Sequence, residues 1–284
     1  MGVKVQDIEL AQAIVEHVDT HLHERMTLDD LVAATHYSKF HLHRAFTTVL
    51  GLPVHTYVQR RRLSEAASLL VHSRRSILDI ALLSGYQSQQ AFSLAFKSLY
   101  KQAPGAFRRR ADAYPLQCRV SLYAHLAAPI VERQQVRLAN DADVPALLAL
   151  MKAAIDGYPE MDEGAFLRHL QARIRQGQAL VLDNEGCLLG ALVFSRSSGL
   201  LEFLGVHPQF RACGVERCLL DVLTTVHLPA QSLEMTTFRA NDKADTGQRA
   251  LLLSLGFQPR ESLVEYGYPT QRLVRLSSLS KEDD

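Results

Sequence analysis

Apolar residues recur at helical spacing through the first hundred positions of the chain. The first series predicts an amphipathic helix over residues 5–24, and its members are Ile8, Ala11, Ile14, Val15, Val18 and Leu22. A longer helix is predicted from Val54 to Leu70, and at ~1.5 Å per residue it spans about 25 Å. Shorter helix pairs are predicted before and after this rod. The pattern therefore predicts an all-α region over residues 1–110.

The two helix pairs repeat one order of residues. The first covers residues 28–53 and the second residues 77–104, and Tyr, Ser, Phe and Pro follow each other in the same order in both. Thr27, Ser38 and Ser88 are predicted N-caps of helices in these pairs. A repeated helix-turn-helix predicts DNA binding. The long helix between the copies would hold two recognition helices near the one-turn spacing of B-DNA, roughly 34 Å.

From Gln135 the pattern becomes one of short strands mixed with helices. Helices are predicted over residues 143–154, 163–176 and 214–226, with a last one that ends at Leu255-Gly256. Strands are predicted over residues 136–138, 179–182, 188–195, 200–206 and 233–239, with more near the C-terminus. This order is typical of an α/β or α+β domain over residues 135–284. Residues 111–134 are predicted to be a linker, part of which alternates like a strand between Cys118 and Leu126.

Length and composition fit this multidomain organisation. A chain of 284 residues that is 47% hydrophobic and 21% charged is ordinary for a globular protein with two domains. No apolar run is long enough to span a membrane and no signal-peptide core is present, so we expect a cytoplasmic protein without membrane association. The four cysteines form no CxxC pair, and His17, His21 and His23 have no carboxylate or cysteine to complete a site. We therefore predict no metal site.

Charge is spread unevenly between the two halves. Residues 1–114 contain 14 Lys and Arg against 10 Asp and Glu, together with eight of the twelve histidines. Residues 115–284 contain 17 basic residues against 20 acidic ones. A basic half joined to an acidic half indicates that only the first half meets a polyanion.

Four stretches of the first half resemble the AraC/XylS family of bacterial transcription regulators, and within it the MarA/SoxS/Rob group. They are YSKFHLHRAF, RRLSEAASLL, ILDIALLSGYQSQQAF and FRRR, and the resemblance covers roughly residues 5–110. It implies seven helices, with two recognition helices in successive major-groove segments of double-stranded promoter DNA. Members of this group usually activate transcription and often bind DNA as monomers, so the resemblance implies an activator that works with RNA polymerase. The residues themselves leave open both the oligomeric state and the choice between activator and repressor.

The first recognition helix is expected to present Lys39, Phe40, His43 and Arg44 to DNA. Arg44 suits guanine and Phe40 suits thymine methyl groups. His43 replaces the Gln of relatives, which leaves the base preference at that position open. A core position is the alternative for Phe40, and its place beside Ser38 favours the DNA face.

The second recognition helix is expected to present Gln89, Gln90 and Ser93, and amide side chains of this kind suit adenine. Leu94 stands where relatives have an arginine. The expected phosphate contacts are Arg60, Arg61, Lys97, Lys101 and Arg108, although runs of arginine are equally typical of a solvated face. The expected core aromatics are Phe46, Phe92 and Phe96.

Residues 135–276 resemble the GNAT acetyltransferase superfamily. The similar stretches are VLDNEGCLLGALVFS, LEFLGVHPQFRACGVERCLLDVL and RALLLSLGF. The resemblance implies a helix N-terminus whose backbone N–H groups bind the pyrophosphate of acetyl-CoA or another acyl-CoA. The residues that it places at this cofactor are Val206, Arg211, Gly214 and Val215.

Two positions depart from the GNAT pattern. Glu216 stands where the family has Gly or Ala, and its charge opposes a pyrophosphate unless the side chain turns away or Arg217 offsets it. Leu252 stands where many members have a tyrosine general acid. Glu202 is a candidate carboxylate base on the central strand, with a solvent-facing residue as the alternative. We expect the GNAT fold to be retained. Enzymatic activity stays open, and we favour ligand binding over catalysis.

Three hypotheses for the whole chain follow. In the first, a sequence-specific activator has a GNAT-like domain that senses a small-molecule effector. In the second, an active N-acetyltransferase is localised or regulated by its DNA-binding half. In the third, the C-terminal half only packs on, dimerises or shields the first half.

Overall fold

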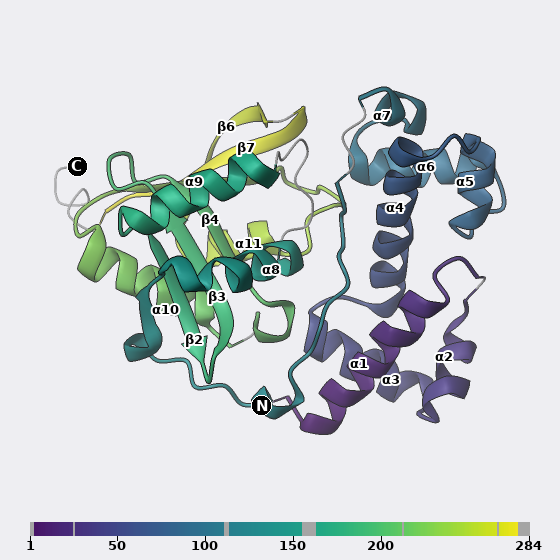
Figure 1. Ribbon diagram of the computed structural model, residues 1–284, viewed down its shortest axis with the longest axis horizontal. Coiled ribbons are helices and arrows are strands. Elements are labelled where there is room, and N and C mark those ends of the chain that lie inside the picture. The colour runs from purple at the N-terminus through teal and green to yellow at the C-terminus, as the bar shows by residue number, and fades with distance from the viewer. Residues whose placement is uncertain are drawn as a thin grey trace. The chain divides into compact units, whose positions relative to one another are not determined.

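The computed structural model describes residues 3–24, 26–110, 114–154, 163–211, 213–265 and 267–277 (Figure 1). The described residues as far as Ala128 form one compact unit, which we call the helical unit. Those from Pro129 onward form a second, the α/β unit. An all-α region followed by a region of mixed helices and antiparallel sheets confirms the predicted fold class.

The helical unit contains seven α-helices in its described residues. They are α1 (Val5–Thr20), α2 (Leu28–Thr35), α3 (Lys39–Leu50), α4 (Val54–His72), α5 (Ile77–Leu83), α6 (Gln89–Tyr100) and α7 (Pro104–Arg110). The predicted rod is α4, which continues past Leu70 to His72. Helix α1 ends earlier than predicted, at Thr20, while Leu22 beyond it remains buried.

The first helix of each helix-turn-helix begins in a capping box. Thr27 Oγ1 accepts the backbone N–H of Asp30, and the Asp30 carboxylate accepts the N–H of Thr27; Ser76 and Asp79 repeat this exchange at α5. Hydrogen bonds from Thr27 lower the pKa of Asp30, and those from Ser76 lower the pKa of Asp79. The two copies therefore start from the same local chemistry.

The recognition helices α3 and α6 begin at serine caps, as predicted. Ser38 Oγ accepts the N–H of His41 at 3.4 Å, and Ser88 Oγ accepts that of Ala91 at 3.2 Å. Each cap satisfies a backbone donor at the helix start that has no partner within the helix.

Aromatic side chains fill the core of each copy. Phe46 is fully buried with its ring edge against Tyr57, at a centroid distance of 5.5 Å. Phe92 and Phe96 are also fully buried, and Phe96 stacks on Tyr100 at 4.3 Å. The predicted core positions of Phe46, Phe92 and Phe96 are confirmed.

The segment Tyr114–Leu122, which we call the strap, lies on the helical unit. Ser64 Oγ on α4 accepts the backbone N–H groups of Leu116 and Gln117, each at 2.9 Å. Further along, the N–H of Leu122 donates to Gln12 Oε1 on α1. The strand suggested by the alternation between Cys118 and Leu126 does not form in these described residues, where the regular element is the 3-10 turn Ala124–Leu126. The alternation instead reflects one side of an irregular segment pressed onto helices.

The α/β unit contains two antiparallel sheets and four α-helices in its described residues. The strands are β1 (Val136–Leu138), β2 (Ala179–Asn184), β3 (Cys187–Phe194), β4 (Leu201–Val206), β5 (Leu233–Phe238), β6 (Gln258–Glu265) and β7 (Tyr268–Arg275). The helices are α8 (Val144–Ala154), α9 (Glu163–Arg175), α10 (Val215–Val222), which runs on as a π-helical turn, and α11 (Gln248–Ser254). The strands and helices predicted from periodicity are present at these places.

The sheets have the strand orders β1-β2-β3-β4 and β5-β7-β6. They are joined where Leu200 and Glu234 form a parallel bridge, and Glu234 N–H donates to Gly199 O at 3.0 Å. Strands β4 and β5 start side by side at this bridge and then belong to different sheets. Strand β3 is buried from Leu188 to Phe194. Because neighbouring side chains of a strand point to opposite faces, both faces of this sheet are covered.

Candidate functional site

The exposed start of α3 is the first candidate DNA-reading surface. Lys39, Phe40, His43 and Arg44 are all exposed, and Phe40 is exposed to 91%. A core position for Phe40 is therefore excluded. The predicted residues of this helix lie together on one solvent-facing surface.

The two cations of this surface, Lys39 and Arg44, each interact with a neighbouring side chain. Lys39 Nζ lies 2.6 Å from Asp29 Oδ1, and Arg44 Nη2 lies 3.5 Å from His41 Nδ1. The ring of His41 stacks on Tyr37, with centroids 5.0 Å apart. Arg44 has no carboxylate partner among the described residues, so its guanidinium can make a bidentate contact with guanine.

The start of α6 is the second candidate surface. Gln89, Gln90 and Lys97 are exposed, and Ser93 is half-buried. Leu94 is exposed to 75% and lies six residues after the cap Ser88, as Arg44 lies six residues after Ser38. An apolar side chain thus stands at the position where the first copy has a cation.

The arginines of α4 correct the prediction of phosphate contacts. Arg60 is 1% exposed, and its Nη2 donates to the carbonyl of Leu116 at 2.9 Å. Arg61 Nε donates to Asp19 Oδ1 at 2.8 Å, and its Nη1 to the carbonyl of Gln117 at 3.0 Å. These guanidiniums bind the strap and α1, so the predicted phosphate contacts of Arg60 and Arg61 are wrong. Helical spacing alone could not reveal that a segment more than fifty residues later covers this face.

The other three predicted phosphate contacts, Lys97, Lys101 and Arg108, differ in their surroundings. Arg108 Nε donates to the carbonyl of Leu70 at 3.0 Å and its Nη2 to that of Arg75 at 2.7 Å, which ties α7 to the end of α4. Lys101 Nζ donates to Ser98 O at 2.8 Å. Lys97, by contrast, is exposed on α6. Lys97 therefore remains the phosphate candidate that the structure leaves open to a ligand.

The predicted acyl-CoA residues lie at the end of β4, in the loop that follows and at the start of α10. Val206 and Val215 are buried, and Gly214 is exposed in the left-handed region at a φ of 80°. Arg211 Nη2 lies 3.4 Å from the carbonyl of Ala154 at the end of α8. Ala212, within the same loop, lies outside the described residues.

Glu216 occupies the first turn of α10 and is only 4% exposed, so it does not turn away into solvent. Burial raises the pKa of Glu216 to about 7, against the opposite effects of its own backbone N–H and of Arg211. Arg217 is exposed. A carboxyl group buried at the helix start does not fit a bound pyrophosphate, since the two would compete for the same backbone donors.

Glu202 has partners that the sequence did not reveal. One carboxylate oxygen lies 2.7 Å from His169 Nε2 and 3.1 Å from Arg173 Nε, and the other pairs with Arg173 Nη2. Glu202 is thus neither an unpaired base nor a solvent-facing residue. The available signal was the four-residue spacing of His169 and Arg173, which puts both on one side of α9. Leu252 is fully buried in α11.

Across the part of the chain that the structure describes, no three or more His, Cys, Asp or Glu gather as metal ligands do. His17 and His21 stack at 4.2 Å, and His21 Nδ1 lies 2.9 Å from the carbonyl of His17. No described helix combines the length and the apolarity needed to cross a membrane.

The helical unit is similar to known proteins. A family model described as a helix-turn-helix domain matches residues 31–110. The uncharacterised HTH-type transcriptional regulator YbfP of Bacillus subtilis is 40% identical over 97 residues, which are 34% of this chain and 33% of that one. The regulatory protein SoxS of Salmonella typhimurium is 35% identical over 102 residues, which are 36% of this chain and 95% of that one.

The α/β unit has a solved neighbour. A GNAT-family acetyltransferase from Bacillus cereus is 15% identical, with a TM-score of 0.40, and the match covers 50% of this chain and 96% of that one. The present chain spans about a third of the length of YbfP. SoxS, however, is matched over nearly its whole length at 35% identity. Through its helical unit, the chain belongs to the AraC family of DNA-binding helix-turn-helix transcription regulators.

Proposed function

We propose that the chain is a transcription activator that reads promoter DNA with α3 and α6, contacts RNA polymerase, and senses a small-molecule effector through its α/β unit. The observation that carries the DNA-reading part is the exposure of Phe40 and Leu94, 91% and 75%, on two capped helices. Apolar side chains of this size, exposed at the start of a recognition helix, suit the thymine methyl groups of a major groove.

The test is selection of duplexes from a random pool by the full chain, followed by titration at several salt concentrations. We expect a bipartite site whose two base clusters are about 10 base pairs apart, and an affinity that falls steeply with salt. Equal affinity for the selected duplex and a scrambled one would contradict the proposal. Transcription in vitro from a promoter that contains the selected site then separates an activator from a repressor.

The sensing role of the α/β unit is supported by the separation of β4 from β5 after the bridge at Leu200, because these adjacent strands are the edges of two different sheets. Because Glu216 does not fit a pyrophosphate, we expect weak or absent acetyl-CoA binding by the full chain at pH 8. Glu216→Gly should raise that affinity by about tenfold or more, and calorimetric titration measures both. Arg175→Gln, which removes an exposed cation of α9, is the matched control. Tight binding by the unchanged chain would show that Glu216 is accommodated.

An N-acetyltransferase is the second candidate, and the contact between His169 and Glu202 favours it, because a carboxylate that orients a histidine supports general base chemistry. Release of free CoA from acetyl-CoA with a panel of amines tests it. His169→Gln should abolish release, while the exposed Lys152→Gln should leave it intact. No release across the panel, together with no effect of acetyl-CoA on DNA affinity, would leave a packing or dimerising role for the α/β unit.

A further inference from the structure

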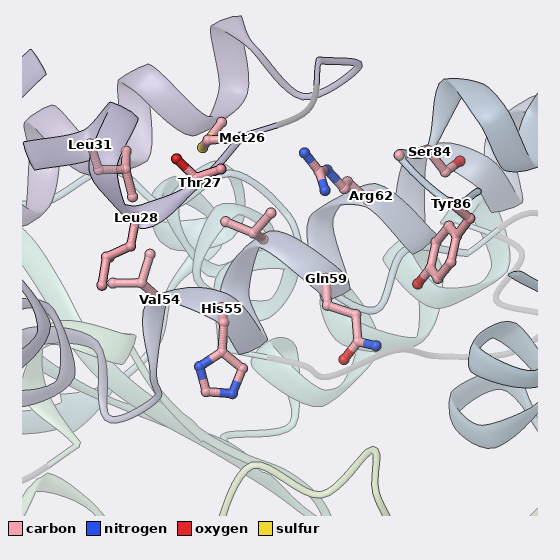
Figure 2. Close-up of a pocket in the computed structure, with 12 residues that line it drawn as sticks. Met26, Thr27, Leu28, Leu31, Val54, His55, Gln59, Arg62, Ser84 and Tyr86 are labelled. Carbon is pink, nitrogen blue, oxygen red and sulfur yellow. The ribbon is translucent and has the colours of Figure 1, made fainter. Parts of the chain in front are cut away.

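A half-open cavity of about 290 Å³ lies in the helical unit, and its lining residues do not include the predicted DNA-reading residues of α3 and α6. Its walls come from three places: the start of α2, one side of α4, and the turn Ser84–Tyr86 that precedes α6 (Figure 2). Both helix-turn-helix copies therefore contribute to one cavity. Its volume lies at the lower end of the range for small-molecule sites.

The walls of this cavity have an apolar part and a polar part. Leu28, Leu31, Val54 and Val58 supply apolar surface. Besides Arg62, the polar side chains are those of Thr27, His55, Gln59, Ser84 and Tyr86. Figure 2 shows Arg62 rising from α4 between Thr27 and Ser84. Among the described residues that line the cavity, none is acidic. A ligand with an apolar body and a single polar end matches this division.

Arg62 is the charged group of the cavity, and it lacks a counter-ion. The guanidinium is half-buried, with Nε donating to the carbonyl of Leu22 at 3.1 Å and Nη2 to that of Glu24 at 2.5 Å. No carboxylate that the structure describes pairs with it, in contrast to Arg61, whose partner is Asp19. Burial lowers the pKa of Arg62, as expected for a cation taken partly out of water without an anion beside it.

The remaining guanidinium nitrogen faces the turn of the second copy. A Cβ on Gly85 would lie 2.8 Å from Arg62 Nη1, and Gly85 itself has a φ of 80°. Glycine here keeps the left-handed turn unstrained and lets its backbone pack directly against the guanidinium, where a Cβ would collide with it. The cation is thus held by carbonyls on one side and by the turn on the other, while Arg62 still lines the pocket.

We propose that this cavity binds a small monocarboxylate with an apolar body, whose carboxylate pairs with Arg62 and whose body lies against Leu28, Leu31 and Val58. The ligand then touches α2 of the first copy, the connecting helix α4 and the turn before α6. A ligand that binds one arrangement of these elements better than another shifts the population towards it. Occupancy therefore changes the affinity for a DNA site that needs both recognition helices at a fixed spacing.

The experiment is calorimetric titration of the full chain with benzoate and with hexanoate, each beside its neutral counterpart, benzyl alcohol or hexanol. We expect at least one carboxylate to bind about tenfold tighter than its alcohol, because a charge-assisted hydrogen bond in a partly buried site is lost with the charge. The two arms show whether an aromatic or an aliphatic body is preferred. Equal binding of acid and alcohol, or no binding of either acid, overturns the proposal.

Two variants assign binding to this cavity. Arg62→Gln removes the charge but also the bonds to Leu22 and Glu24, so Val58→Phe, which fills the space and leaves Arg62 intact, is measured beside it. Both should lose at least about tenfold in carboxylate affinity. The exposed Arg74→Gln on the same unit should lose none. Unchanged affinity in a folded Val58→Phe chain places the ligand elsewhere and overturns the proposal.

The DNA readout is fluorescence anisotropy of the selected duplex with and without the bound acid. This result is separable from the proposed function, since carboxylate binding is measured without DNA. Carboxylate binding that leaves duplex affinity unchanged in the unaltered chain would overturn the coupling of this cavity to DNA.

Discussion

The two helix-turn-helix copies share a framework and differ in what they present to DNA. Both begin in a capping box, both recognition helices start at a serine, and both have a buried phenylalanine eight residues after that serine. Yet the first presents Lys39, Phe40 and Arg44, and the second presents two glutamines and Leu94.

This difference separates the requirements of folding from those of recognition. Positions that face the core stay apolar or aromatic in the two copies, and the helix caps stay Ser or Thr, because each departure from that chemistry costs stability. Positions that face solvent are free to differ, so one copy suits a guanine and a thymine methyl while the other suits adenine and thymine. A site read by this chain should accordingly have a guanine requirement in one half only.

The largest effect should come from the shared framework. Phe46→Ala and Phe96→Ala each remove a fully buried ring, and each should lower the free energy of unfolding by about 3–5 kcal/mol. Urea denaturation measures both. Phe40→Ala is the matched control, and its exposed ring predicts little change in stability. Very unequal losses at the two buried positions would mean that the copies are not equivalent in the fold.

The next effect concerns the cation of the first copy. Arg44→Ala should weaken binding to the selected duplex by about 1–3 kcal/mol and relax the preference for guanine at one position. Anisotropy titrations with each of the four bases at that position measure this. His43→Ala on the same face distinguishes loss of one base contact from general damage. A uniform loss on every duplex would instead mean that Arg44 contacts phosphate.

A smaller effect should follow from giving the second copy the residue of the first. Leu94→Arg adds a cation at the position equivalent to Arg44, so affinity should rise at low salt and the salt dependence should steepen by about 0.9 in log–log slope if a phosphate is reached. Lys97→Gln should change the slope in the opposite direction. A Leu94→Arg chain with an unchanged slope and unchanged base preference would show that this part of α6 does not meet DNA.

The smallest effect concerns the two capping boxes and pH. Because the pKa values of Asp30 and Asp79 are lowered in the folded chain, their stabilisation is complete above the unfolded pKa, about 3.9, and is lost as pH falls through the folded values. Ser76→Ala, which removes the hydroxyl donor to Asp79 and keeps the backbone donor, should flatten the fall of the urea midpoint below about pH 4. Glu9→Gln on the exposed side of α1 should not. If the urea midpoint of the Ser76→Ala chain fell as steeply with pH as that of the unchanged chain, the capping boxes would not be the cause of the pH dependence.

Much of the fold followed from residue patterns. Periodicity located α4 and the succession of helices and strands along the α/β region, and residue types located the caps, since these depend on neighbours a few positions away. The exposed residues of α3 followed for the same reason. The roles of Arg60 and Arg61 did not, because they depend on carbonyls of the strap. The partners of Glu202 are likewise distant in sequence, on α9.

The strap also sets where the portable module ends. Its residues accept hydrogen bonds from α4, donate others to it and reach Gln12 on α1, so the folded helical unit of this chain extends beyond α7. A chimera that joins a new partner directly after Arg110 would strip a buried arginine of its acceptor. A junction after Ala128 would keep the helical unit whole. A force applied to the chain after this junction would act first on the contact between Leu122 and Gln12 of α1.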